Sequence, residues 1–285
     1  MKKPGALASV ILALTLVVIS ILSGCATADT ARLKVVTSTS LISSIVERVG
    51  GDMVEIVNII PPAQCPGHFD VTPGDIQKLA DADLFLMHGW QGEKFSQELI
   101  NSANNPDLTV VKLDAKVGNN DNWLTPSVQQ AAVDKITAAL SQADAANSTA
   151  YQEAAAEYKD KIAAKEAEVK ARLAQVDLSN VNVMCADMLV GFVNWAGFNI
   201  VASYGRPESL TPQIVKDLVD KGKEARVVLI IDNLQSGQDT GKGIAEELAS
   251  KRVILSNFPD GFDNTESWEK TIDQNIALLL EAIAR

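Results

Sequence analysis

The sequence predicts an α/β protein of two lobes, each a (βα)4-like unit with a parallel sheet, joined by one long bridging α-helix. Short apolar runs alternate with amphipathic stretches over most of the chain, which is typical of parallel strands connected by helices. One long helical pattern separates two such series. The 285 residues, 47% of them hydrophobic, are enough to bury a core in each lobe. We expect an N-terminal lobe over 32–146, the bridging helix over 147–177 and a C-terminal lobe over 178–285.

The N-terminal lobe is expected to contain four strands and four helices. The apolar run at 53–60 is nearly continuous, which indicates a strand buried on both faces. Two glycines at 50–51 end the first helix, and Pro73 begins the second. In chain order we predict a strand at 33–37, a helix at 41–49, a strand at 53–60, a helix at 73–80, a strand at 84–88, a helix at 95–101, a strand at 109–113 and a helix at 126–145.

The bridging helix is predicted to run from Thr149 to Gln175. Thr149 and Gln152 have the spacing of a capping box. The apolar residues recur at threes, fours and one seven, so they form one narrow stripe: Tyr151, Ala155, Tyr158, Ile162, Val169, Leu173 and Val176. A short coiled coil is the alternative. The interruption of the stripe at Lys165 favours a helix that lies along the protein and spans both lobes.

The C-terminal lobe repeats the alternation of strands and helices. We predict strands at 181–185, 199–203, 225–231 and 252–255. The intervening helices are expected at 188–196, 211–221 and 241–249, and a last helix at 268–283.

The first residues resemble a targeting signal. Lys2 and Lys3 precede an apolar run at 6–22, and the following Leu-Ser-Gly-Cys25 resembles the lipobox of bacterial lipoproteins. This resemblance implies a signal peptide at 1–24 and acylation of Cys25, with palmitate among the acyl chains. Residues 25–31 would then be a lipidated tether, and the rest of the chain would lie outside the cytoplasmic membrane. The alternative is an uncleaved N-terminal anchor.

Composition excludes several classes of protein. The formal charge of −11 argues against a nucleic-acid partner, since phosphate affinity comes from clustered Lys and Arg. Two histidines leave little room for a multi-metal hydrolase, and three cysteines are too few for a disulfide scaffold. The chemistry therefore depends on a small set of thiols and imidazoles.

Candidate ligand-binding residues follow several predicted strands, where open parallel sheets bind their ligands. The loop at 61–73 is the most informative, because Cys65 and His68 are three residues apart on a stretch stiffened by Pro and Gly and can converge on one ion. Further candidates at predicted strand ends are His88, Cys185 and Asp232. His88 also fits a hydrogen-bonded core histidine, and Asp232 also fits a cap of the helix near Gly241.

Several motifs carry a resemblance to a known family. A Val-Val-Thr-Ser-Thr strand is followed by Val-Gly-Gly-Asp52, a Pro-Pro loop with His68, Thr-Pro-Gly-Asp75 and Leu-Ala-Asp-Ala-Asp83-Leu. This series resembles the zinc- and manganese-binding lipoproteins of ABC importers (cluster A-I). The resemblance implies two α/β lobes bridged by one long helix, a metal ion in the cleft between them and delivery of that ion to an ABC permease.

The ligand positions of that family match this chain unevenly. The first-lobe histidine of the family matches His68, whereas the second, two residues before a Trp, is matched by Asp121. At the third position Cys185 is the closest soft ligand. The fourth, a late carboxylate, falls near 256–260. The scaffold matches while the ligand set departs from it.

Two interpretations of this departure stay open. In the first, Cys65, His68 and Cys185 bind a transition-metal ion as transported cargo, with Asp121, Asp232 or His88 completing the shell. Zinc is the first expectation, and manganese and copper are the alternatives. In the second, Cys65 and Cys185 form a disulfide, and the cargo is a chelated metal or a small organic ligand.

A thiol-dependent extracytoplasmic enzyme is a third and weaker alternative, since nothing in the sequence orients a base. We expect a monomeric binding protein that is not an enzyme and has no organic cofactor. Its expected partners are an ABC permease and, through acylated Cys25, membrane lipid.

Overall fold

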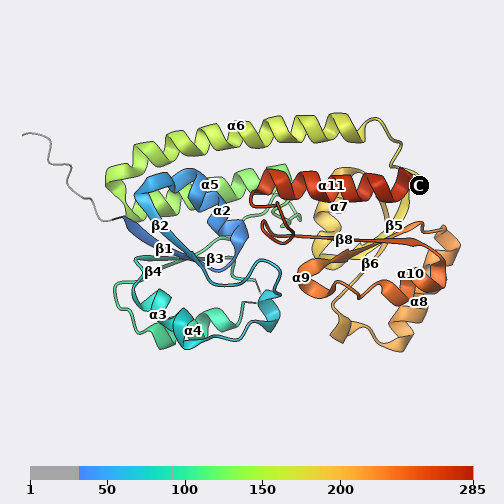
Figure 1. The fold of residues 1–285 in the computed structure, drawn as a ribbon, viewed down its shortest axis with the longest axis horizontal. Coiled ribbons are helices and arrows are strands. Elements are labelled where there is room, and N and C mark those ends of the chain that lie inside the picture. Colours follow the sequence, from blue (N-terminus) through green and yellow to red (C-terminus); the bar gives the residue numbers. More distant parts are fainter. Residues whose placement is uncertain (1–31, 91–92, 285) are drawn as a thin grey trace, which may run out of the picture. The chain divides into compact units, whose positions relative to one another are not determined.

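The computed structural model describes residues 32–90 and 93–284, and within them it contains two parallel sheets flanked by helices (Figure 1). The predicted signal peptide, Cys25 and the tether at 25–31 lie outside the described residues. No helix in the described part of the chain is long and apolar enough to cross a membrane. The predicted fold class, two α/β lobes joined by a long helix, is confirmed.

The N-terminal lobe is a four-stranded parallel sheet in the order β2-β1-β3-β4. One face carries α2 and α5, and the other carries α3 and α4 (Figure 1). The Thr72 side chain begins α3 in a capping box with Asp75. The elements are β1 (Leu33–Thr37), α2 (Ser40–Gly50), β2 (Val54–Asn58), α3 (Pro73–Ala80), β3 (Leu84–Met87), α4 (Phe95–Ala103), β4 (Thr109–Lys112) and α5 (Pro126–Ala143).

The C-terminal lobe repeats this topology with the order β6-β5-β7-β8, again parallel throughout. Its elements are β5 (Asn182–Ala186), α7 (Val190–Ala196), β6 (Asn199–Tyr204), α8 (Pro212–Ala225), β7 (Leu229–Asn233), α9 (Leu234–Gly237), α10 (Lys242–Leu248), β8 (Lys251–Leu255) and α11 (Trp268–Ala284). Because both sheets follow the βα pattern, the loops after their strands gather at the carboxyl edges, where ligands bind in such folds.

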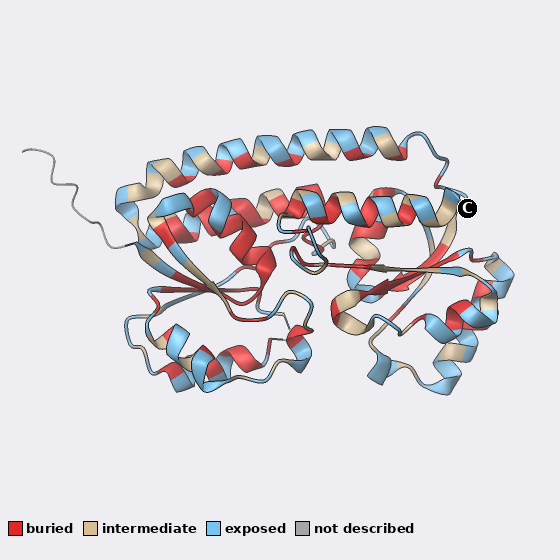
Figure 2. Ribbon diagram, viewed as in Figure 1, coloured by how far each residue is buried: buried red, intermediate tan, exposed pale blue. Residues whose placement is uncertain are grey.

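The bridging helix α6 (Ser148–Leu173) packs against α2, α5 and α11. Figure 2 shows its buried residues along the side that faces α5 and α11, and exposed residues on the opposite side. The predicted stripe is buried from Tyr151 to Leu173, whereas Val176 lies beyond the helix and is exposed. Lys165, which interrupts the stripe, pairs with Asp273 of α11 at 2.8 Å.

Three local predictions are wrong. The strand predicted at 225–231 begins only at Leu229, because α8 extends through Ala225 and Arg226 ends it in the left-handed conformation. The strand predicted at 53–60 is β2, which lies at the edge of its sheet and is mostly not buried, so the expected burial on both faces is wrong. The predicted capping box at Thr149 does not form, since α6 already begins at Ser148.

The predicted lobe boundaries at 146 and 177 fall near the two ends of α6. They stay a prediction, because the chain from Leu33 onward forms one compact unit.

Candidate functional site

Part of the interface between the lobes is held by neutral hydrogen bonds. The Asn122 amide donates to the Met188 carbonyl at 2.7 Å and to the Asn257 side-chain oxygen at 3.2 Å. Asn257 itself donates to the same Met188 carbonyl at 3.1 Å. We call these three residues the amide contact. It joins the loop before α5 to the loops after β5 and β8.

Aromatic residues and a hydroxyl reinforce this part of the interface. The buried Trp268 indole donates to the Trp123 carbonyl at 3.0 Å, and the Ser40 hydroxyl donates to the Pro259 carbonyl at 2.7 Å. Trp90 of the N-terminal lobe stacks on Phe258 of the C-terminal lobe at 6.5 Å between ring centroids. The amide contact therefore belongs to a packed region, and the neighbouring Asp121, a predicted ligand, is exposed.

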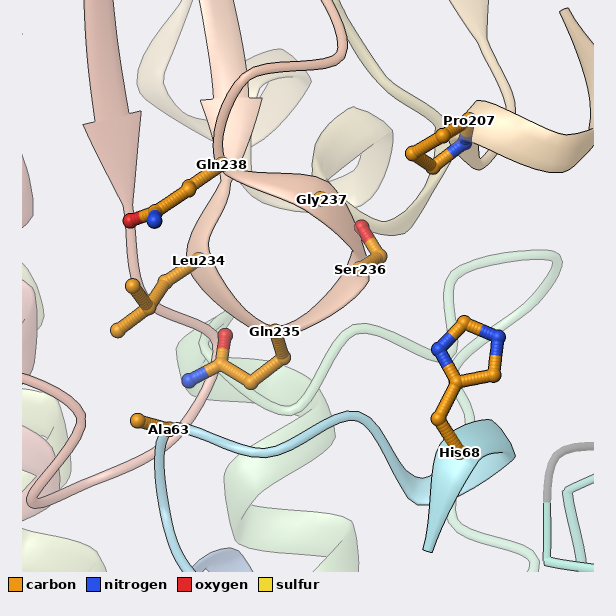
Figure 3. Close-up of a pocket in the computed structure, with 8 residues that line it drawn as sticks. All are labelled: Ala63, His68, Pro207, Leu234, Gln235, Ser236, Gly237 and Gln238. Atoms are coloured by element: carbon orange, nitrogen blue, oxygen red, sulfur yellow. The ribbon is translucent and has the colours of Figure 1, made fainter.

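The same interface holds a pocket of about 490 Å³ (Figure 3), and its lining residue Gln235 accepts a hydrogen bond from the Asn257 N–H at 3.0 Å. We call it the His68 pocket. Figure 3 shows His68 on one wall facing the α9 turn, with Pro207 beyond. The Gln235 amide donates to the Pro62 carbonyl at 2.9 Å, so the lobes also meet beside the pocket. The lining residues are Ala63, His68, Pro207, Leu234, Gln235, Ser236, Gly237 and Gln238.

Local structure presents His68 to the pocket. A single 3-10 turn, η2 (Pro66–His68), begins with a proline, and the His68 N–H donates to the Cys65 carbonyl at 3.0 Å. The His68 Nε2 lies 3.6 Å from Oε1 of Glu208, which belongs to the 3-10 turn η5 (Pro207–Ser209) of the other lobe. Both side chains are more than half exposed, at 62% and 55%. An imidazole and a carboxylate from opposite lobes thus face each other.

Arg206, which precedes η5, also reaches the N-terminal lobe. A methyl group at Gly67 would collide with its guanidinium, so the two residues are in close contact. This contact across the lobes is with the residue next to His68.

The structure does not bring Cys65 and Cys185 together with His68. Within the described ranges, no three His, Cys, Asp or Glu side chains are grouped so that they could hold a metal ion. Both thiols are free and buried, so the disulfide alternative is not realised. The ligand roles of the thiols stay a prediction without support from this arrangement.

Burial and the nearby Asp187 raise the pKa of Cys185 to about 12. A cysteine nucleophile acts as the thiolate, so a thiol that keeps its proton is poorly suited to that role.

His88, another predicted candidate, is a buried residue of the N-terminal lobe. Its Nε2 lies 2.8 Å from the Thr39 hydroxyl, and its ring stacks on Trp90 at 3.6 Å between centroids. Burial lowers the pKa of His88 well below 6.5, so the imidazole is neutral at physiological pH. The nearby Glu93 accepts hydrogen bonds from Ser38 and from backbone N–H groups, while burial raises its pKa.

Asp232 lies at the end of β7 but points into the C-terminal lobe. It is fully buried and pairs with Arg252 at 2.8 Å. Its other oxygen accepts hydrogen bonds from the Tyr204 hydroxyl at 2.9 Å and from the Gly241 N–H at 2.7 Å, which fits the predicted cap near α10. These contacts occupy the carboxylate within its own lobe.

Sequence reasoning missed Glu208 and the polar residues of α9. Glu208 follows β6 in the same way as His68 follows β2, and this common position at a sheet's carboxyl edge is the signal that could have found it. Ser236 and Gln238 offered no such signal, because α9 is a single helical turn.

Two α/β lobes with equivalent topology, a long connecting helix and a pocket between the lobes define a two-lobed binding protein. The chain belongs to the ZnuA family, described as zinc-uptake complex component A, periplasmic, whose pattern matches residues 35–282.

Individual relatives are similar over most of their length. The chain is 23% identical to the metal ABC transporter substrate-binding lipoprotein SsaB of Streptococcus sanguinis, over a 310-residue alignment that covers 100% of both chains. The Mn-bound periplasmic metal-binding protein of Candidatus Liberibacter asiaticus superposes with a TM-score of 0.75 at 18% identity, covering 88% of this chain and 99% of the other. FpvC of Pseudomonas aeruginosa, solved with Ni²⁺, also gives a TM-score of 0.75 at 23% identity, covering 89% and 97%.

Proposed function

We propose that this protein is the extracytoplasmic, lipid-anchored substrate-binding component of an ABC importer, and that it binds a transition-metal ion between its lobes. Family membership and the lipoprotein-like start of the sequence support this proposal. The protein acts by binding rather than by catalysis. It then delivers the ion to a permease in the cytoplasmic membrane.

The observation that carries the proposal is the distance of 3.6 Å between His68 Nε2 and Glu208 Oε1. Two ligands that each lie about 2.1 Å from one tetrahedral zinc ion are about 3.4 Å apart. Little movement is needed for both side chains to bind the same ion. Because they belong to different lobes, such an ion would tie the lobes together at the pocket.

Zinc is the metal that we propose first. Imidazole and carboxylate are ordinary zinc ligands. The same pair also suits manganese or iron, whereas copper(I) prefers sulfur, and both described thiols are buried.

Metal titration of the full-length protein tests the site. We expect one zinc ion per chain, and at least tenfold weaker binding in His68→Ala and in Glu208→Gln, measured by calorimetry. Glu247→Gln, which removes an exposed carboxylate on α10, is the matched control and should bind as the parent does. Equal affinity in all four proteins would refute the His68–Glu208 site.

Delivery and anchoring are tested in cells that express the protein. Loss of the protein should lower zinc accumulation from dilute medium. Cys25→Ala should move the protein out of the membrane fraction. An unchanged zinc content after loss of the protein would contradict delivery.

A further inference from the structure

The His68 pocket is much larger than a bare ion requires. An ion with six waters occupies roughly 200 Å³ at about 30 Å³ per water. The pocket volume of about 490 Å³ falls in the range of small-molecule sites. A ligand larger than a hydrated ion therefore fits between the lobes.

The donors around the pocket are also unusual for a bare ion. His68 is the single metal-ligating side chain in the lining, and the remaining polar side chains are the neutral Gln235, Ser236 and Gln238. Gln235 is already engaged by Pro62 and Ser256. With Glu208 added, the protein supplies two ligands, so most of the coordination shell of the ion must come from elsewhere.

Arg206 adds a positive charge beside this site. Its half-buried guanidinium has no hydrogen-bond or ion-pair partner in the part of the chain that the structure describes, and it lies against Gly67, next to His68. A cation at this place repels a bare divalent ion and attracts an anionic group. Guanidinium binds carboxylates with paired hydrogen bonds.

We infer that the cargo is a metal ion held in a small anionic chelate of carboxylate type. This inference rests on the proposed metal-binding function. The ion takes His68 and Glu208 as its protein ligands and keeps the oxygen ligands of the chelator. Arg206 binds a carboxylate of the chelator, and Ser236 and Gln238 donate hydrogen bonds to it.

Calorimetry of the full-length protein with Zn²⁺, with zinc citrate and with citrate alone tests the inference. We expect zinc citrate to bind at least tenfold more tightly than Zn²⁺. Arg206→Gln should weaken zinc citrate binding at least tenfold and should make Zn²⁺ binding up to threefold tighter, because the repulsive charge is removed. Arg206→Lys keeps the charge and should lose less affinity for zinc citrate than Arg206→Gln does.

Lys223→Gln, which removes an exposed charge in the last turn of α8, is the matched control and should change neither affinity. Thermal unfolding of each variant verifies that it is folded.

The outcomes distinguish a failure of this inference from a failure of the proposed metal-binding function. If Zn²⁺ binds as tightly as zinc citrate or more tightly, the inference is overturned while the metal-binding function stands. If neither binds, or if citrate alone binds as well as zinc citrate, both are overturned. A fall in zinc citrate affinity with Lys223→Gln equal to that with Arg206→Gln would also overturn the role of Arg206.

Discussion

The amide contact and the His68 pocket adjoin each other in the interface between the lobes, yet they differ in burial and in charge. At the amide contact, Asn122 and Asn257 share one carbonyl, and the rings of Trp123, Phe258 and Trp268 nearby are buried. At the His68 pocket, the imidazole and Glu208 are exposed and separated by 3.6 Å. The difference supports a division of roles, in which the amide contact holds the lobes together and the His68 pocket is the proposed ligand site.

The largest expected effect on stability is in the packed region around the amide contact. Trp268→Ala removes a fully buried indole and its hydrogen bond to Trp123, so we expect the free energy of unfolding to fall by about 3–5 kcal/mol. Urea denaturation measures it. Trp195→Ala removes a half-buried indole on α7 and should cost less than half as much. A loss below about 1 kcal/mol for Trp268→Ala would mean that this region does not hold the lobes.

The amide contact itself should contribute less. Asn122→Ala removes two hydrogen bonds between the lobes and leaves the Asn257 side-chain oxygen without that donor. We expect a loss of about 1–3 kcal/mol in the same assay. Asn101→Ala, at an exposed position of α4, should change stability by less than about 0.5 kcal/mol. Equal effects of the two substitutions would mean that the amide contact does not hold the lobes together.

Acid should also lower the free energy of unfolding through a residue near the amide contact. His88 stays neutral in the folded protein, whereas in the unfolded chain it gains a proton below about pH 6.5. The unfolded state then binds more protons, so stability falls as the pH drops below 6.5 and is complete above it. This residue alone should lower the stability at pH 5.5 relative to pH 8 by an amount on the order of 1 kcal/mol.

Comparison with His88→Gln isolates that contribution. Glu93, whose raised pKa acts in the opposite direction, titrates in both proteins and cancels in the difference. Unfolding curves at pH 8 and pH 5.5 should show a smaller acid loss for His88→Gln. Identical losses would exclude His88 as the source.

The smallest expected effect concerns the thiols. If His68 and Glu208 bind the ion, Cys65→Ser and Cys185→Ser should each change the zinc affinity by less than about twofold, corresponding to about 0.4 kcal/mol. Calorimetry on folded variants measures this. A loss of tenfold or more in either variant would restore the thiols predicted from the sequence as ligands.

The fold could be predicted because local patterns determine it. The stripe of α6 from Tyr151 to Leu173 is the buried face of the helix, and Pro73 begins α3. Strand ends are less well determined. The strand predicted to stop at Cys185 continues to Ala186, and Cys185 pairs with Ser203 and Ile231 on both sides. One residue of difference places that thiol inside the sheet rather than at its edge.

Only the part of the candidate site that lies on a single loop could be predicted from the sequence. His68 stands on a short, proline-stiffened loop, so its place beside the cleft could be inferred from sequence. Its partner Glu208 lies 140 residues further along the chain, and no local pattern pairs the two. The contacts of Asn122 and Arg206 depend on how the lobes meet, which the alternation of strands and helices does not specify.

The walls of the His68 pocket include η2 and η5, each a single turn begun by a proline. Such turns rearrange as loops do, within nanoseconds to microseconds, whereas rotation of whole lobes takes microseconds to milliseconds. Because the amide contact holds the two lobes together, we expect local movement of these turns to admit and release the cargo. The residence time of the cargo would then be determined by the bonds that His68, Glu208 and Arg206 make, so that substitutions at these three positions act on the dissociation rate.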